Sequence, residues 1–293
     1  MSDEKNIFQK RHAVSKGATR MVTVNGVRLA YEIHGTGEIP LVLVHGWLES
    51  RRTWDRVVPH LDDSFRVITY DLRGYGESER PSDRTGSSKH VADLAALIEH
   101  QHLELSSAWV AGQSSGGEMA LFLAAKQPDL LRGIIAHEPG FGSLLADDPA
   151  MAPMLDSYPQ LVAEVTERIK SGDHAGGAEQ FVEEGLGKGL WAKFPPDFRQ
   201  DLINNAPNTL DDLNDPDASA FDLEWVREFT RPVLLTIGDQ TAPMYPPVIT
   251  KLAEALPSAE IKEITGAGHP VQAQRPEEFA KAINAFVRRH TND

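Results

Sequence analysis

The feature that most constrains this chain is a five-residue turn between an apolar strand and an apolar helix. Residues 108–111 read Ala-Trp-Val-Ala, the turn at 112–116 reads Gly-Gln-Ser-Ser-Gly, and a helical apolar pattern covers 119–125. A sharp strand-to-helix turn strains the backbone of the central residue, so its neighbours must be small, which the glycines satisfy. The pattern predicts a nucleophile elbow that exposes the Ser114 hydroxyl beside the positive end of a helix. The alternative is an ordinary turn, because a lone Gly-x-Ser-x-Gly also arises by chance.

Apolar runs of strand length alternate with helical patterns along the rest of the chain. Two short strands are expected around the Asn-Gly hairpin signal at 25–26, and helices at about 89–100, at 248–255 and at 276–290. The alternation predicts a mostly parallel sheet with helices on both faces. Further strands are expected at residues 40–44, 65–70, 131–137, 232–237 and 261–265.

Residues 139–229 interrupt this alternation. They show no convincing strand and contain helical stretches at 158–170, 177–186 and 198–204, separated by Pro, Gly and Asp clusters. Roughly ninety residues are too many for a plain connection, so we predict an inserted helical cap over the carboxyl ends of the strands. The acidic stretch 211–217 is expected to be a solvated loop rather than a metal site. The predicted organisation is a flexible tail at 1–20, a core formed by 21–138 and 230–290, and the cap at 139–229.

The charge balance narrows the range of partners. The 293 residues include 29 basic and 43 acidic side chains, a formal charge of −14, and no cysteine. Nucleic acid and anionic membranes are therefore not expected as partners, because both need a basic surface, and thiolate chemistry is excluded. The amino terminus lacks the apolar core of a signal peptide, and no apolar stretch is long enough to cross a bilayer, so a cytoplasmic location is expected.

Four motifs, taken in chain order, resemble the α/β-hydrolase family. They are His-Gly-Trp at 45–47, Asp-Leu-Arg-Gly-Tyr-Gly-Glu-Ser at 71–78, the elbow at 112–116, and Gly-Ala-Gly-His at 266–269. The resemblance covers nearly everything from residue 21 to 290. It implies an eight-stranded, mostly parallel sheet with an active site under a helical lid, and it implies neither a cofactor nor a metal.

A serine hydroxyl becomes a useful nucleophile only when a base accepts its proton. His269 is placed for that role, in a glycine-rich loop between a strand and a helix. His45 belongs to the turn motif and is expected to be structural. The histidines expected to be solvated are His90, His100 and His102.

The third member of a triad must be a carboxylate, which orients the histidine. Many family members carry an aspartate at the position that Thr241 occupies here. Glu138 is the preferred acid because it directly follows the strand after the elbow helix, and its strand end should share a rim with the Thr241 loop. Asp239 is the alternative acid, and a carboxylate elsewhere is a third possibility. Within the family, the chain resembles the zearalenone-lactonase type in two features, the glutamate after this strand and the Ser-Ser-Gly elbow.

The resemblance also implies an oxyanion hole and a substrate pocket. The oxyanion hole would use the backbone N–H groups of Ser115 and Trp47. Apolar cap residues are expected to line the pocket, although for any one of them packing of the cap against the core is the alternative. The candidate pocket residues are Met154, Trp191, Phe194 and Phe221.

These observations predict a serine hydrolase that cleaves a small apolar ester or lactone through an acyl-enzyme, including a zearalenone-type macrocyclic lactone. A general aryl or alkyl esterase, a carbon–carbon bond hydrolase or a cofactor-free perhydrolase would use the same triad. A small-molecule receptor on the same fold is the non-enzymatic alternative. Epoxide hydrolase and haloalkane dehalogenase activities are disfavoured, since both need a carboxylate nucleophile where Ser114 stands.

Overall fold

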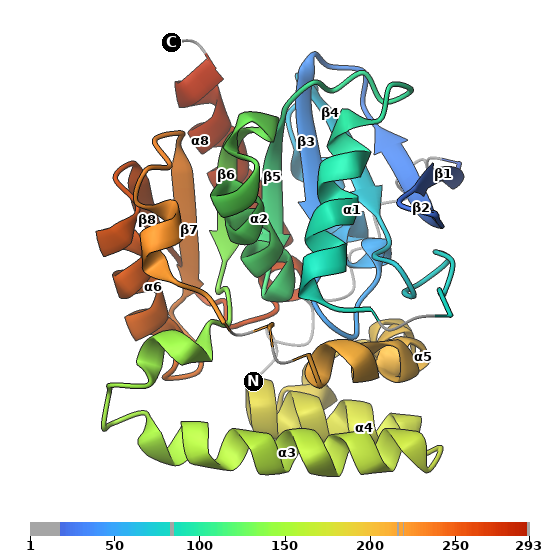
Figure 1. The fold of residues 1–293 in the computed structure, drawn as a ribbon, viewed down its shortest axis with the longest axis vertical. Coiled ribbons are helices and arrows are strands. Elements are labelled where there is room, and N and C mark those ends of the chain that lie inside the picture. Colours follow the sequence, from blue (N-terminus) through green and yellow to red (C-terminus); the bar gives the residue numbers. More distant parts are fainter. Residues whose placement is uncertain (1–17, 83–84, 216, 219, 292–293) are drawn as a thin grey trace, which may run out of the picture.

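The computed structural model describes residues 18–82, 85–215, 217–218 and 220–291, and it contains one eight-stranded sheet (Figure 1). The spatial order of the strands is β1-β2-β4-β3-β5-β6-β7-β8. Strand β2 pairs antiparallel with β1 and β4, and all other neighbours pair in parallel. The prediction of a mostly parallel eight-stranded sheet is therefore confirmed. The strands are β1 (Arg20–Val24), β2 (Val27–His34), β3 (Ile39–Val44), β4 (Phe65–Tyr70), β5 (Ala108–Gln113), β6 (Leu131–His137), β7 (Val233–Gly238) and β8 (Ala259–Ile264).

Helices cover both faces of the sheet, as predicted (Figure 1). Side chains alternate between the faces, so that Val42 and Val44 of β3 join one core and Leu41 and Leu43 join the other. The first core is completed by α1 (Ser87–Glu99), α2 (Ser115–Lys126) and α6 (Tyr245–Ala255), and the second by α8 (Pro276–Thr291). A short helix, α7 (Val271–Gln274), lies just before α8.

Three further helices lie beyond the carboxyl edge of the sheet, and we call them the cap helices (Figure 1). They are α3 (Ala152–Lys170), α4 (His174–Gln180) and α5 (Pro196–Leu213). Helices α3 and α5 are longer than the predicted stretches 158–170 and 198–204, and each continues through an internal proline, Pro159 or Pro207. A proline inside a helix costs a hydrogen bond, but here the burial of the helix face in the cap core outweighs that cost. The described residues also form short 3₁₀ helices and one π-helix, η6 (Phe181–Leu186). The 3₁₀ helices are η2 (Arg51–Arg56), η3 (Val58–His60), η4 (Pro128–Leu130), η5 (Gly142–Leu145), η7 (Trp191–Lys193) and η8 (Leu223–Val226).

Helix α5 is fastened to the core through Asp212, which is buried. Its carboxylate accepts hydrogen bonds from the Tyr75 hydroxyl (2.6 Å) and the Thr85 hydroxyl (3.1 Å) and lies 3.0 Å from His90 Nε2. Two expectations are therefore wrong: His90 is buried rather than solvated, and Asp212 belongs to a helix rather than to a solvated loop. The physical reason is mutual satisfaction, since polar groups tolerate burial when they bond to one another.

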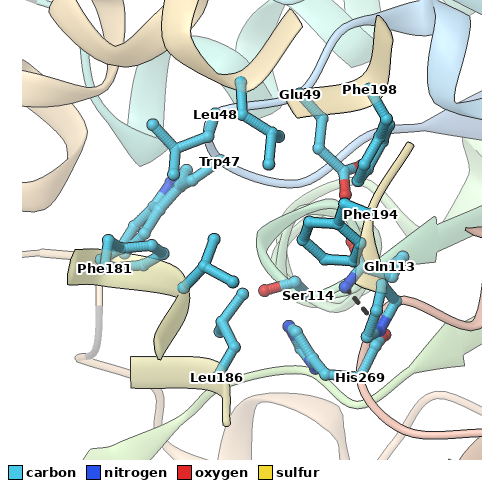
Figure 2. Close-up of a pocket in the computed structure, with 13 residues that line it drawn as sticks. Trp47, Leu48, Glu49, Gln113, Ser114, Phe181, Leu186, Phe194, Phe198 and His269 are labelled. Atoms are coloured by element: carbon cyan, nitrogen blue, oxygen red, sulfur yellow. Dashed lines mark hydrogen bonds between the residues drawn. The ribbon is translucent and has the colours of Figure 1, made fainter. Parts of the chain in front are cut away.

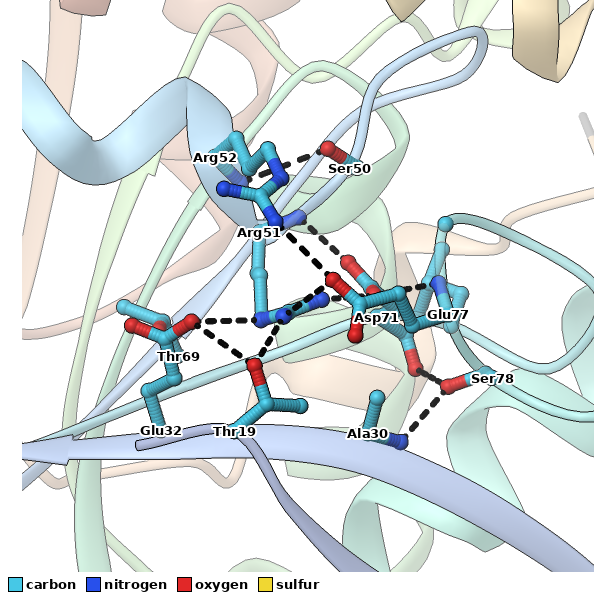
Figure 3. A network of polar contacts seen from close by, with 12 residues as sticks. Thr19, Ala30, Glu32, Ser50, Arg51, Arg52, Thr69, Asp71, Glu77 and Ser78 are labelled. Atoms are coloured by element: carbon cyan, nitrogen blue, oxygen red, sulfur yellow. Dashed lines mark hydrogen bonds and ion pairs between the residues drawn. The ribbon is translucent and has the colours of Figure 1, made fainter. Parts of the chain in front are cut away.

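The loop that follows β3 is held by a buried arginine, Arg51, at the start of η2 (Figure 3). Its guanidinium pairs with Asp71, with Glu32 (3.1 Å) and with Glu77 (2.9 Å), and it donates to the Thr19 hydroxyl (2.8 Å). This network ties the loop to β2 and to the turn after β4, and so fixes one wall of the site described below.

The predicted tail at 1–20 lies mostly outside the described residues. Of its three described positions, Arg20 already belongs to β1 and pairs with Tyr31 of β2.

Candidate active site

Ser114 occupies the turn between β5 and α2, with φ 54° and ψ −127°. This is a strained conformation for a residue with a side chain. The Ser114 N–H donates to the His137 carbonyl at the end of β6 (2.9 Å). Both flanking glycines are sterically required, because a Cβ at Gly112 or Gly116 would come within 2.2 Å of main-chain atoms. The backbone geometry is that of the nucleophile elbow predicted from the strand–turn–helix pattern.

His269 lies in the loop between β8 and α7 and is buried. Its Nδ1 is 2.9 Å from Glu138 Oε2. Because a carboxylate can only accept, Nδ1 carries the proton and Nε2 is left as the basic nitrogen. The Ser114 hydroxyl and the His269 ring face the same pocket (Figure 2).

Glu138 directly follows β6 and is buried, with φ 45°. Its Oε1 accepts from the Gly238 N–H (2.8 Å), and its Oε2 accepts from the Thr241 hydroxyl (2.7 Å) as well as from His269. Burial opposes ionisation of this carboxyl, but the adjacent histidines and the Gly238 N–H outweigh it and lower the pKa of Glu138 to about 2. The group is therefore a carboxylate at neutral pH.

Asp239, the alternative acid, has a different environment. Its side chain is exposed, and its Oδ1 accepts from the Gly266 N–H (2.7 Å), which stabilises the turn before His269. The structure thus brings together Ser114, His269 and Glu138, and it places Asp239 in a supporting turn.

Tyr245 is a neighbour of His269 that the sequence patterns did not indicate. The two rings stack with centroids 4.6 Å apart and planes inclined by 14°, and the Tyr245 hydroxyl lies 3.3 Å from His269 Nε2. Tyr245 is the first residue of α6. Its contact is with a histidine 24 residues later, and the sequence around Tyr245 contains no pattern that predicts this contact. The stacked ring restricts the orientation of the imidazole.

A pocket that opens to solvent lies between the cap and the carboxyl edge of the sheet (Figure 2). Of the four predicted pocket residues, Phe194 lines it. Met154 and Phe221 instead pack with the core on the α2 face, where Phe221 stacks on Phe141 (4.2 Å), and Trp191 is buried in the cap core. The cap residues that line the pocket are Phe181, Val182, Leu186, Phe194, Phe198 and Leu202.

Of the two residues predicted to supply the oxyanion hole, Trp47 belongs to the pocket lining, and Ser115 directly follows the lining residue Ser114. Trp47 lines the pocket and packs on Phe181 (ring centroids 6.5 Å apart). Ser115 is the first residue of α2, where backbone N–H groups lack partners within the helix. His45 is structural as expected: its Nε2 accepts from the Leu72 N–H (3.1 Å).

In the described part of the chain, no group of three or more His, Asp or Glu side chains is arranged to hold a metal ion. None of the helices found there combines the length and the apolar character that a bilayer crossing requires.

Comparison with known proteins places this geometry in a family. The model of the alpha/beta hydrolase fold matches residues 39–276. The chain is 34% identical to a soluble epoxide hydrolase of Corynebacterium over 45% of each chain, and 26% identical to a pimeloyl-[acyl-carrier protein] methyl ester esterase of Vibrio vulnificus over 88% of this chain and 98% of that enzyme. A thermophilic esterase from Thermogutta terrifontis superposes with a TM-score of 0.76 at 25% identity, covering 94% of this chain and 99% of that one. The chain belongs to the alpha/beta hydrolase family, and its similarity to members of that family identifies it as a hydrolase.

Proposed function

We propose that this protein is a serine hydrolase that cleaves a carboxylic ester or lactone through an acyl-enzyme. The observation that carries the proposal is the buried Glu138 carboxylate, 2.9 Å from His269 Nδ1, with His269 and Ser114 lining one pocket. This arrangement supplies a nucleophile, a base and an orienting acid in the roles that acyl transfer needs. Similarity to two esterases supports the same substrate class.

In the proposed reaction, Ser114 Oγ attacks the carbonyl carbon while His269 Nε2 takes the hydroxyl proton. The carbonyl oxygen becomes an oxyanion that accepts hydrogen bonds from the Trp47 and Ser115 N–H groups. Collapse of this intermediate breaks the ester bond, and His269 returns the proton to the departing alcohol. A water molecule, deprotonated by His269, then attacks the acyl-enzyme. The acyl–Oγ bond breaks, the acid is released, and His269 returns the proton to Ser114 Oγ. Glu138 remains ionised throughout and stabilises the imidazolium.

The walls of the pocket favour a small apolar substrate. Six apolar cap side chains line the pocket that Ser114 also lines, as is usual for sites that bind small apolar molecules. A glutamate acid after β6 and the Ser-Ser-Gly elbow support a macrocyclic lactone of the zearalenone type as the first lactone to test.

The test is a pH-stat screen of the wild type and Ser114→Ala with aryl esters, acyl-homoserine lactones and macrocyclic lactones. We expect the wild type to consume base with at least one class, and the variant to lose about 10⁴-fold or more of that rate. Activity on aryl esters alone would identify a general esterase. Labelling of Ser114 by a serine-directed phosphonate without sustained hydrolysis would identify a receptor and overturn the proposal.

A further inference from the structure

A buried carboxyl group that the proposed chemistry does not use lies in the wall of the pocket. Glu49 follows the oxyanion-hole turn, is 6% exposed and lines the same pocket as Ser114. Figure 2 shows its carboxyl pointing from the loop after β3 toward the pocket, beside Phe194 and Phe198. A carboxyl group among aromatic and aliphatic side chains is costly to desolvate unless it has partners.

Only one of the two carboxyl oxygens is occupied. Glu49 Oε1 accepts from Gln272 Nε2 (2.7 Å), which connects the loop after β3 to α7. Among the described residues no group meets hydrogen-bond geometry with Glu49 Oε2. The Thr53 hydroxyl, which lacks a partner by the same criterion, interacts with this carboxyl closely enough to oppose the rise in its pKa. A purely structural link between the two loops would leave no reason for the second oxygen to be buried and unpaired.

Two further acceptors near this carboxyl are also unpaired. Gln113, which lines the pocket, donates its amide to the His269 carbonyl (3.2 Å), and its Oε1 is buried without a partner in the described chain. The Oε1 atom of Gln272 is in the same situation. Glu49 and Gln113 belong to the pocket lining, whereas Gln272 does not and instead bonds to Glu49. The wall of the pocket therefore contains two buried oxygens, Glu49 Oε2 and Gln113 Oε1, without a partner in the described chain.

The chemistry of this part of the wall distinguishes between possible ligand groups. Burial raises the pKa of Glu49 to about 8, against the opposing effect of polar contacts with Thr53, Gly46 and Gln272, so the carboxyl keeps its proton at neutral pH. A neutral carboxyl does not attract an ammonium ion. A hydroxyl group, in contrast, can donate to the acceptor oxygens and accept from the carboxylic acid at the same time.

We propose that Glu49, together with Gln113, binds a hydroxyl group on the apolar portion of the substrate, so that the enzyme selects hydroxylated esters. This inference rests on the proposed hydrolase function, and it adds a specificity-determining residue. Hydrogen-bonding sites discriminate strongly, because an analogue without the hydroxyl leaves buried polar groups unpaired.

The test compares 4-nitrophenyl esters of 3- and 4-hydroxyphenylacetic acid with the matching methyl-substituted esters, which have nearly the same shape. For the wild type we expect kcat/KM for the better hydroxy isomer to exceed that of its methyl counterpart about tenfold or more. Glu49→Gln should retain that preference, since an amide both donates and accepts. Glu49→Met should reduce the ratio to within about twofold. Glu118→Gln is the matched control, because it removes a buried carboxyl outside the pocket lining, and the ratio should not change.

Equal kcat/KM for the hydroxy and methyl esters in the wild type would overturn the inference, as would a preference for an aminomethyl ester. A second measurement depends neither on turnover nor on the folding of Glu49→Met. Calorimetry of Ser114→Ala compares the methyl ester of the preferred hydroxyphenylacetic acid with the methyl ester of the matching methyl-substituted phenylacetic acid. The hydroxylated ester should bind more tightly. Hydrolysis without a hydroxyl preference would refute only this inference. A binding preference without hydrolysis of any ester would refute the proposed function and leave the hydroxyl site standing.

Discussion

The Thr241 hydroxyl donates a hydrogen bond of 2.7 Å to Glu138 Oε2. The family resemblance implies that many members carry an aspartate at the Thr241 position, whereas in this chain the threonine hydroxyl bonds to the carboxylate that we propose as the acid. The two residues are adjacent because β6 and β7 pair in parallel and their carboxyl ends share an edge. Glu138, which follows β6, and Thr241, which follows β7, therefore meet at this edge, where Glu138 also accepts from His269.

Glu138→Gln tests the identity of the acid. We expect it to lower kcat about 10²–10⁴-fold, because an amide cannot stabilise the imidazolium and can impose the wrong tautomer on His269. Asp239→Asn is the matched control and should stay within about threefold of the wild type, since that side chain is exposed. Steady-state kinetics on the best ester from the screen gives both values. The opposite ranking would assign the acid to Asp239.

Thr241→Val tests the hydroxyl that supports the carboxylate. Removal of one hydrogen bond to a charged group should lower kcat about three- to tenfold and leave KM nearly unchanged. Thr241→Ser keeps the hydroxyl and should retain most of the activity. If both variants lose activity equally, the methyl group of Thr241 matters through packing and the hydrogen bond does not.

Two substitutions of Tyr245 distinguish the effect of ring stacking on His269 from the effect of the hydrogen bond. Tyr245→Phe retains the stacked ring and should keep kcat within about threefold, whereas Tyr245→Ala should lower kcat tenfold or more because the imidazole loses its orientation. Kinetics on one ester decides the question. A large loss in Tyr245→Phe would show instead that the tyrosine hydroxyl takes part in the chemistry.

The low pKa of Glu138 makes a prediction about acid stability. The folded protein holds the pKa of this group at about 2 against an ordinary 4.5, so its contribution to stability is present above pH 4.5 and is lost as pH falls through 2. The full contribution is on the order of 3 kcal/mol. Urea unfolding of the wild type and Glu138→Gln should give free energies whose difference is constant between pH 6 and pH 4.5 and becomes smaller from pH 4.5 to pH 3. A constant difference over that range would contradict the assigned pKa.

Asp212→Ala tests how the cap is attached to the core. The substitution leaves the buried Tyr75 and His90 and the half-buried Thr85 without their shared partner, and we expect a loss of about 3–5 kcal/mol in unfolding free energy. Asp217→Ala, at an exposed position, should change it by less than about 0.5 kcal/mol. Urea denaturation provides the comparison. Equal stability of the two variants would mean that apolar packing alone holds α5 in place.

The parts of the site that the sequence predicts are those set by strand ends. Ser114, Glu138 and His269 each follow a strand of a parallel sheet, and the carboxyl ends of such strands converge regardless of the detailed packing. The sheet is likewise predicted from the alternation of strands and helices. Each strand or helix is recognised from the spacing of its own apolar residues, which is a local property of the sequence.

The cap was harder to predict because its packing is decided at long range. Which face of a cap helix meets the pocket depends on partners far along the chain, so Phe194 lines the pocket while Met154, Trp191 and Phe221 do not. The partners His90 and Asp212 are 122 positions apart, and neither residue alone signals burial.

The main-chain contacts around Gly112 and Gly116 have a consequence for the protein's chemistry. The atoms that a Cβ there would strike belong to Val44, His45, Gly116 and Gly117, and none of them is the Ser114 hydroxyl. The need for glycine at these two positions therefore comes from the main chain at the end of β3 and at the start of α2. Ser114→Ala, which removes only the hydroxyl, leaves these contacts untouched.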